Sequence, residues 1–144
     1  LLAEKFGVAA DVWSVTSFNQ LRRDAQETQR WNMLNPEKPR RHSYVEEQLG
    51  PTAGPVIAAS DYMRVLADQL SPWLGGRLLA LGTDGMGRSE SREALRRHFE
   101  VDAESIVIAS LYKLAAEGKC DAASVAGAIR DLGVDPEKKS ALYA

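Results

Sequence analysis

The sequence has few of the side chains on which active-site chemistry usually depends. Its 144 residues include one cysteine, Cys120, and two histidines, His42 and His98. A single cysteine excludes an internal disulfide and is typical of proteins in a reducing compartment. We interpret Cys120 as a small residue at a junction between helices. Neither histidine has another histidine or a cysteine at the spacing of a metal site.

Long apolar runs and a strong charge bias are also missing. No run approaches the roughly 18 apolar residues of a membrane-spanning helix, and the charged N-terminal residues do not resemble a signal peptide. The net charge is −2, too close to zero to indicate nucleic acid or anionic lipid as a partner. Between Arg22 and Arg41, six Arg or Lys residues oppose three Asp or Glu residues, which is typical of a solvated face. We therefore expect a cytoplasmic protein without membrane or nucleic-acid partners.

Caps, turn residues and hydrophobic periodicity divide the chain into alternating helices and strands. Leu1–Phe6 resembles the end of an amphipathic helix that stops at Gly7, so we expect the chain to be the tail of a longer protein. The predicted strands are Val12–Val15, Val56–Ala59 and Arg77–Leu81. The predicted helices are Ser17–Arg30, Ser43–Leu49, Tyr62–Leu70, Ser89–Phe99, Asp102–Glu117 and a last one from Asp121 to the stop at Gly133. A short strand at Ile106–Ile108 is an alternative to the middle of the Asp102–Glu117 helix.

Strands that alternate with helices predict an α/β domain with an open, mostly parallel sheet and helices on both faces. With 44% hydrophobic residues, the chain has enough apolar material for one core. Three strands are few for such a sheet, and we expect the remaining material to lie upstream of Leu1. Residues 1–144 are therefore interpreted as a single domain within a much longer chain.

The most distinctive stretch joins the strand Arg77–Leu81 to the helix predicted from Ser89. Glycines at positions 82, 85 and 87 permit positive φ angles and close approach of another backbone, and helix N-termini present free N–H groups. Two phosphate-binding motifs fail, because arginine rather than lysine follows Gly87 and glutamate rather than glycine occupies position 90. Carboxylates at positions 90 and 93 would also repel a phosphate. The loop is therefore either a docking surface or only a tight connection.

We place a candidate interface in this loop. Arg88 is the cation of an otherwise acidic and polar turn, and it can reach a carboxylate on a second surface. The opposing interpretation is that Arg88 pairs locally with Asp84 or Glu90. The residues assigned to the interface are Thr83, Asp84, Gly85, Gly87, Arg88 and Ser89.

No residue is assigned to catalysis, to cofactor binding or to metal binding. Ser60, Ser89 and Ser91 precede helices and are explained as N-caps, and no nucleophile elbow occurs. His98 lies at the C-terminal end of its predicted helix, where packing and the helix dipole account for it. From these residues alone, the chain is a non-catalytic α/β module.

Several stretches occur, in one order, in a single known family. They are Ala10–Phe18, Arg30–Pro36, Ala59–Met63, Leu81–Glu93 and His98–Asp102. Together they resemble the C-terminal domain of the homodimeric, thiamine diphosphate-dependent pyruvate dehydrogenase component of bacterial pyruvate dehydrogenase complexes. The similarity runs from Leu1 to Ala144, and the Leu81–Glu93 motif is too long to be a chance match.

The resemblance implies a transketolase-type C-terminal domain with a mostly parallel sheet, which stabilises a homodimer and braces the catalytic domains upstream. The whole enzyme decarboxylates pyruvate on thiamine diphosphate and Mg²⁺ and reductively acetylates lipoyl groups of the dihydrolipoyl acetyltransferase core. The family's cofactor motif is Gly-Asp-Gly followed by asparagine. Residues 82–85 do not match it, because Thr83 is inserted and no asparagine follows Asn35. We therefore expect this chain to bind neither cofactor itself, and to lack the strand that the family places before the helix ending at Phe6.

The leading hypothesis is a structural and dimer-interface domain of pyruvate dehydrogenase (acetyl-transferring), inactive as an isolated fragment. The alternative is a non-catalytic regulatory module that binds a ligand, because α/β sheets often bind nucleotides at the carboxyl ends of their strands. Titration with nucleotides and organic phosphates separates the two hypotheses.

Overall fold

The computed structural model describes all residues from Leu1 to Ala144. Its two strands are β1 (Val56–Ala59) and β2 (Leu78–Leu81). The α-helices are α1 (Leu2–Phe6), α2 (Phe18–Leu34), α3 (Tyr44–Leu49), α4 (Val65–Asp68), α5 (Arg92–Phe99), α6 (Ala103–Ala116) and α7 (Ala122–Asp131). Two 3₁₀ helices complete the structure, η1 (Ser71–Trp73) and η2 (Ala141–Tyr143). None of the helices combines the length and the apolar character that crossing a bilayer requires.

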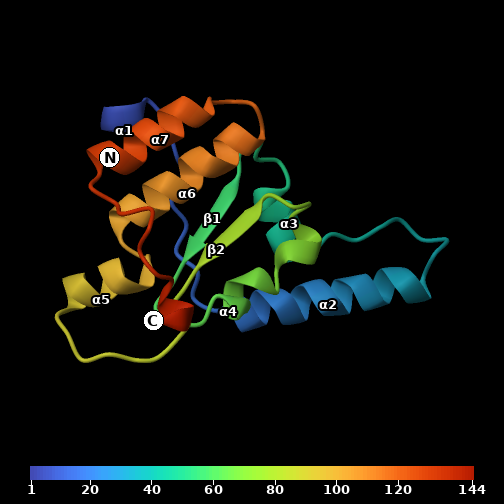
Figure 1. Ribbon diagram of the computed structural model, residues 1–144. Helices are drawn as coiled ribbons and strands as arrows, with labels where there is room; N and C mark the ends of the chain where they lie inside the picture. The colour runs from blue at the N-terminus through green and yellow to red at the C-terminus, as the bar shows by residue number, and fades with distance from the viewer.

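The two strands form a parallel sheet at the centre of the molecule (Figure 1). Val56 lies opposite Leu78, and both strands fall where they are predicted, with β2 beginning one residue late. The predicted strand Val12–Val15 is wrong, because this segment has no strand partner and Val12 is 95% exposed. Residues that suit a pleated surface form a strand only where a neighbour supplies the ladder hydrogen bonds.

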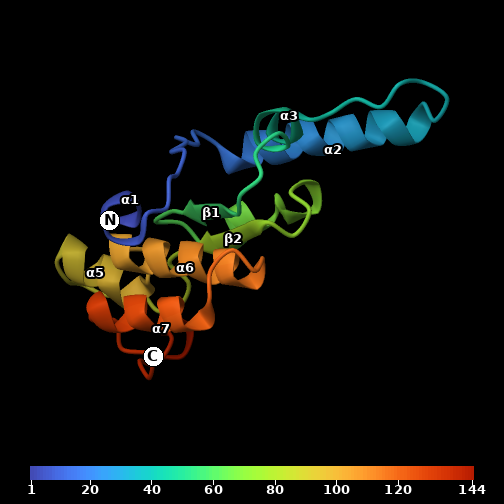
Figure 2. The same ribbon diagram turned by 90° about the horizontal axis from the view of Figure 1, so that it is seen from above.

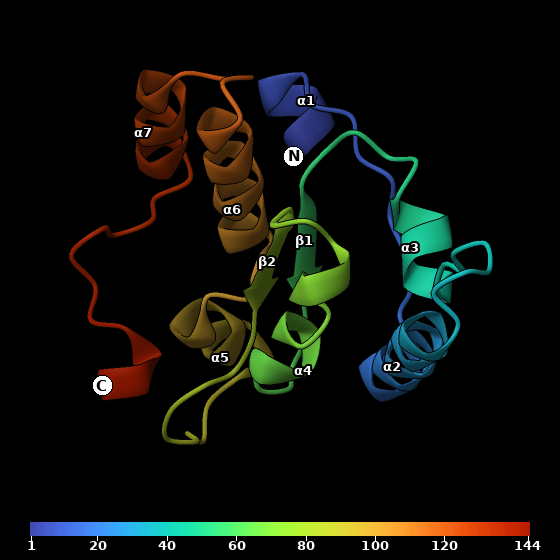
Figure 3. The ribbon, with the colours of Figure 1, turned by 90° about the vertical axis from the view of Figure 1, so that its right-hand side faces the viewer.

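Helices cover both faces of this sheet, as predicted. α6 lies along one face with α7 packed behind it, whereas α4 lies on the other face with α2 and α3 beyond it (Figure 2 and Figure 3). The chain is therefore an α/β domain whose parallel sheet is smaller than the three strands that we predicted.

Each face of the sheet has its own apolar cluster. Side chains alternate across a strand, so Val56 and Leu78 face the α2 side, and their neighbours Ile57 and Leu79 point toward α6. The cluster on the α2 side has as its buried members Ala25, Val45, Leu70 and Leu74. The cluster between α6 and α7 has as its buried members Val107, Leu111 and Ala128, with Leu2 and Phe6 of α1 packed against it.

Side-chain caps fix the starts of the longer helices. Ser17, Ser91, Asp102 and Asp121 each accept a hydrogen bond from the backbone N–H three residues ahead, at 3.2, 3.2, 2.9 and 2.6 Å respectively. The helix predicted from Ser89 therefore begins only at Arg92, because Ser91 is its cap. Glu90 consequently lies outside the first turn of α5, contrary to prediction.

Three further boundaries differ from the prediction. The helix expected over Tyr62–Leu70 is reduced to α4, because the Ser60 hydroxyl accepts a hydrogen bond from the Tyr62 N–H at 3.0 Å and closes a turn instead. α2 extends to Leu34, one turn beyond the predicted end. The strand alternative at Ile106–Ile108 is wrong, since these residues lie inside α6.

Candidate functional site

The first half of the predicted interface loop is packed inside the domain. Thr83 donates a backbone hydrogen bond to the Tyr62 carbonyl at 2.9 Å and a side-chain hydrogen bond to the Asp61 carbonyl at 2.7 Å. Gly82 is buried so closely that a Cβ atom there would lie 2.6 Å from both the Arg64 nitrogen and the Tyr62 oxygen. The loop after β2 is thus fastened to the segment that follows β1.

Gly85 does allow the close backbone approach that the sequence indicates, but the approaching segment belongs to this chain. Its φ angle is 111°, and a Cβ atom would collide with the carbonyl of Ala141 in η2. Gly87 has open space around it, and Met86 between them is 75% exposed. The assigned residues therefore divide into two groups. Thr83 and Asp84 are half-buried and Gly85 contacts the Ala141 carbonyl, whereas Gly87, Arg88 and Ser89 are exposed.

Arg88 is exposed and forms no ion pair, so the local pairing with Asp84 or Glu90 is absent from the structure. Its charge lies close enough to His98 to disfavour protonation of that imidazole. Arg88 therefore presents an uncompensated guanidinium on the outer side of the loop.

His98 stands behind the loop on α5, with its ring edge-on to Phe99 at a centroid distance of 4.8 Å. Its Nε2 atom is buried and has no hydrogen-bond partner. Burial lowers the pKa of His98, and the positive charges of Arg88 and Lys138 lower it further, while Glu100 acts in the opposite sense.

His98 lies in the last turn of α5, as predicted, but its interaction with the helix dipole stays a prediction, because a second cation also contacts that end of the helix. The Lys138 ammonium donates to the carbonyls of Arg97 and His98 at 3.1 and 2.7 Å and to the Glu100 carboxylate at 3.0 Å. Packing, the other half of the prediction, is confirmed by the Phe99 contact.

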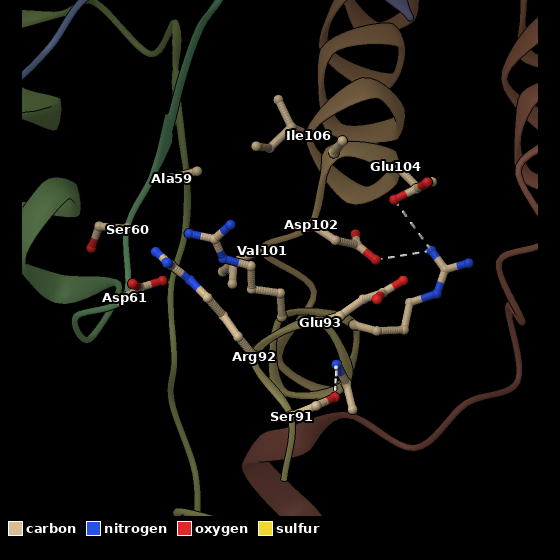
Figure 4. A pocket seen from close by; sticks show the side chains of 14 residues that line it. Ala59, Ser60, Asp61, Ser91, Arg92, Glu93, Val101, Asp102, Glu104 and Ile106 are labelled. Atoms are coloured by element: carbon tan, nitrogen blue, oxygen red, sulfur yellow. Dashed lines mark hydrogen bonds and ion pairs between the residues drawn. The ribbon is translucent and has the colours of Figure 1, made fainter.

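A groove of about 1060 Å³ opens at the carboxyl end of β1, between the N-terminal ends of α5 and α6 (Figure 4). In the close view, the Arg92 side chain extends toward Ser60 and Asp61, which follow β1. Ligands of open α/β sheets bind at this end of the strands. In the sequence, the only signals for this groove are Ser60, Ser91 and Asp102. All three are predicted as helix caps, a role that needs no ligand.

The charges in the groove are mixed and partly neutralised. Arg97 pairs with Asp102 at 2.9 Å and with Glu104 at 3.8 Å. Burial would raise the pKa of Asp102, but hydrogen bonds from Ser105 and Arg97 outweigh it, so the pKa is lower than usual. The carboxylates of Asp61, Glu93, Asp102 and Glu104 outnumber the guanidinium groups of Arg92, Arg96 and Arg97.

The loop does not fit thiamine diphosphate. A diphosphate needs free backbone N–H groups and a metal-binding carboxylate beside it, whereas Gly85 is covered by η2 and the Thr83 N–H is already bonded to Tyr62. The structure also gathers no cluster of His, Cys, Asp or Glu side chains that could hold a metal ion. No step of cofactor chemistry is derived from these residues.

A parallel sheet with helices on both faces and a glycine-rich loop after its last strand defines an α/β domain. Residues 1–102 match the family of transketolase-like TK C-terminal domains, and the chain belongs to this family.

Pyruvate dehydrogenase E1 components from several bacteria are similar to nearly the whole chain. The chain is 50% identical over 143 residues to the pyruvate dehydrogenase E1 component of Pseudomonas aeruginosa, covering 99% of this chain and 16% of that protein. It is 45% identical over 139 residues to the component of the same name in Escherichia coli strain K12, covering 96% of this chain and 15% of that protein. The Mycolicibacterium smegmatis component is 44% identical over 135 residues, covering 94% and 14% respectively. The chain therefore corresponds to the C-terminal part of these proteins and spans about a sixth of their length.

Proposed function

We propose that this chain is the structural and dimer-interface domain of a pyruvate dehydrogenase (acetyl-transferring). The observation that carries the proposal is the amount of surface left open. A compact monomer of this mass exposes about 7,300 Å², whereas this chain exposes 9596 Å². Large apolar side chains contribute to that surface, including Tyr62 at 68%, Met63 at 60% and Met86 at 75% exposed. Contiguous exposed apolar surface is characteristic of a contact with another domain or subunit.

The loop supplies a polar anchor for the same contact. Arg88 has no partner within the chain, and Met86 lies two residues away with its side chain exposed. Arginine is one of the residues in which interface hot spots are enriched. We infer that Arg88 pairs with a carboxylate of an upstream domain or of the second subunit.

The chemistry of the whole enzyme belongs to this proposal rather than to these residues. By analogy with the relatives, the full chain uses thiamine diphosphate and Mg²⁺ to decarboxylate pyruvate and transfers the acetyl group to lipoyl groups of a dihydrolipoyl acetyltransferase core. Residues outside positions 1–144 supply the cofactor site and the catalytic groups. The domain described here would hold those parts in place as a homodimer.

The methionines provide a direct test in the intact enzyme. Methionine oxidation by hydrogen peroxide depends on exposure of the sulfur, and Met63 and Met86 are both exposed in this chain. If another surface covers these methionines, peptide mass spectrometry after peroxide treatment should show that both are oxidised at least about tenfold more slowly than N-acetylmethionine amide. Oxidation of both at the rate of the free compound would contradict an interface at this surface.

The alternative function, regulation by a bound ligand, has one observation in its favour, the groove at the carboxyl end of β1. Its excess of carboxylates over guanidinium groups disfavours a nucleotide or an organic phosphate. Calorimetric titration of the intact enzyme with such compounds tests this directly. Saturable binding that Arg92→Ala abolishes would favour the regulatory function over the structural one.

A further inference from the structure

A basic hairpin extends from the side of the domain, and its far end projects beyond the other elements (Figure 1). It consists of α2 and the loop that follows it, residues 18–42, and we call it the basic hairpin. From Arg22 to Arg41 it contains six Arg or Lys and three Asp or Glu residues, a net charge of +3. Because the whole chain has a net charge of −2, the remainder carries −5. The near-neutral total thus conceals a separation of charge between the hairpin and the body.

The loop of the hairpin is pinned to the helix by side-chain amides. Asn32 accepts a hydrogen bond from the Arg41 N–H and donates one to the Arg41 carbonyl, both at 2.9 Å. Asn35 donates to the Trp31 carbonyl at 2.9 Å and closes the end of α2. These hydrogen bonds fix Arg41 beside the end of α2, where Trp31 lies.

Two cations are held against one aromatic ring in this loop. The guanidinium carbon of Arg41 lies 3.6 Å from the centroid of the Trp31 ring, and the Lys38 ammonium lies 5.6 Å from it. Neither side chain forms an ion pair or donates a hydrogen bond, whereas the adjacent Arg40 pairs with Glu46 at 3.0 Å. Stacking covers a face of the guanidinium and leaves its in-plane N–H donors available.

We infer that Arg41 and Lys38, held on Trp31, form a clamp for the carboxylates of an acidic segment of another protein. Bidentate hydrogen bonding to a carboxylate uses the in-plane donors that stacking leaves free. Lys38 adds a second positive charge at the same place. Leu34, which is 58% exposed, lies three residues after Trp31 in α2 and so on the same side of the helix, where it offers apolar contact to residues between the acids.

The same features disfavour nucleic acid as the ligand. A protein that binds single strands presents free aromatic faces on which bases stack, but Arg41 already lies against Trp31, whose side chain is half-buried. The charge of −5 on the rest of the chain would also repel a polyanion that extends past the hairpin. An acidic protein segment avoids both difficulties because it is short and needs no stacking surface.

The test uses the intact protein and a short fluorescein-labelled poly-L-glutamate peptide, with binding followed by fluorescence anisotropy. Arg41→Lys keeps the charge but removes bidentate donation, so it should weaken binding about tenfold. The pair Arg41→Glu with Lys38→Glu should weaken it further. The pair Lys5→Glu with Lys139→Glu makes the same change of net charge at two exposed lysines outside the hairpin and should alter affinity less than about twofold. Circular dichroism confirms that each variant is folded.

Three results would overturn the inference. Equal weakening by the control pair Lys5→Glu with Lys139→Glu and by the double hairpin variant would show that only net charge matters, and unchanged binding in Arg41→Lys would remove the clamp. The third result is tighter binding of an oligouridylate than of poly-L-glutamate of equal charge, through the same residues. It would show that the ligand of the hairpin is RNA and not an acidic protein segment. None of these readouts depends on decarboxylase activity, so failure here leaves the proposed interface function untouched.

Discussion

Arg88 and His98 show how a single residue can be assigned a role only after its neighbours are known. In the sequence, Arg88 has two acidic residues within reach, and His98 has a helix end to stabilise. In the structure, Arg88 has no ion pair, and Lys138 binds the carbonyls at the helix end. The contacts of both residues therefore differ from those that the sequence indicates. Both changes follow from contacts with residues distant in sequence.

Replacement of Arg88 by alanine in the intact enzyme tests the interface at the residue scale. If the guanidinium pairs with a desolvated carboxylate across the contact, its loss leaves that partner unpaired and costs on the order of 2–5 kcal/mol. Sedimentation velocity should then show a weakened dimer, with loss of activity at low enzyme concentration. Arg23→Ala removes another exposed arginine and should leave the dimer unchanged. Wild-type dimer affinity in Arg88→Ala would reduce Arg88 to a solvent-facing side chain.

His98 predicts a dependence of stability on pH. Burial and the nearby charges of Arg88 and Lys138, opposed by Glu100, lower its pKa in the folded state below the unfolded value of 6.5. The unfolded chain therefore binds the proton more readily, and stability is lost as the pH falls from about 7 through 6.5 toward the lowered pKa. Asp102 and Glu46, whose pKa values are also lowered, add losses only below about pH 5.

The measurement is the urea midpoint of the intact protein between pH 7.5 and 5.5. His98→Gln cannot be protonated, so its curve should be flatter than that of the wild type across this interval. Parallel curves for the two proteins would mean that His98 titrates alike in the folded and unfolded states.

At the scale of the element, local signals predict what local interactions determine. Ser17, Asp102 and Asp121 are recognisable as caps, and the helices that they start are confirmed, because a cap bonds to a residue three positions away. Val56–Ala59 is confirmed as a strand. Val12–Val15 has similar residues but no strand beside it, and this absence of a partner cannot be read from the segment itself.

The loop after β2 contacts η2. The sequence predicts a close backbone approach at this loop but not that the approaching segment is η2. In Gly85→Ala, the new alanine would have to keep the positive φ angle of the glycine, and its Cβ atom would collide with the Ala141 carbonyl. Backbone strain of this kind costs about 1–3 kcal/mol. Gly87→Ala, two residues away in open space, should change stability by less than about 0.5 kcal/mol. The melting temperatures of the two variants compare the positions directly, and equal values would mean that η2 does not hold the loop.

At the scale of the whole molecule, the fold class was predictable and the candidate site only in outline. The alternation of strands and helices determines an α/β domain, since each parallel crossover needs a helix. The groove combines Ser60 and Asp61 with the starts of α5 and α6, which are brought together only when the chain has folded. Likewise, no local pattern shows that the partner of Gly85 is the chain's own C-terminal segment.

The open surface predicts how residues 1–144 behave when produced alone. The area in excess of a compact monomer is about 2,300 Å², more than the roughly 800 Å² that each partner buries in a standard interface. β1 is paired only with β2, so its other edge retains unbonded backbone groups that can recruit another strand. We therefore expect the isolated chain to self-associate and to unfold with low cooperativity.

Sedimentation velocity over the micromolar range should show species larger than the monomer, and a soluble fusion partner at either end should slow but not prevent association. A strictly monomeric chain with a sharp, high-temperature unfolding transition would show that this surface needs no cover, and would count against the interface function as well.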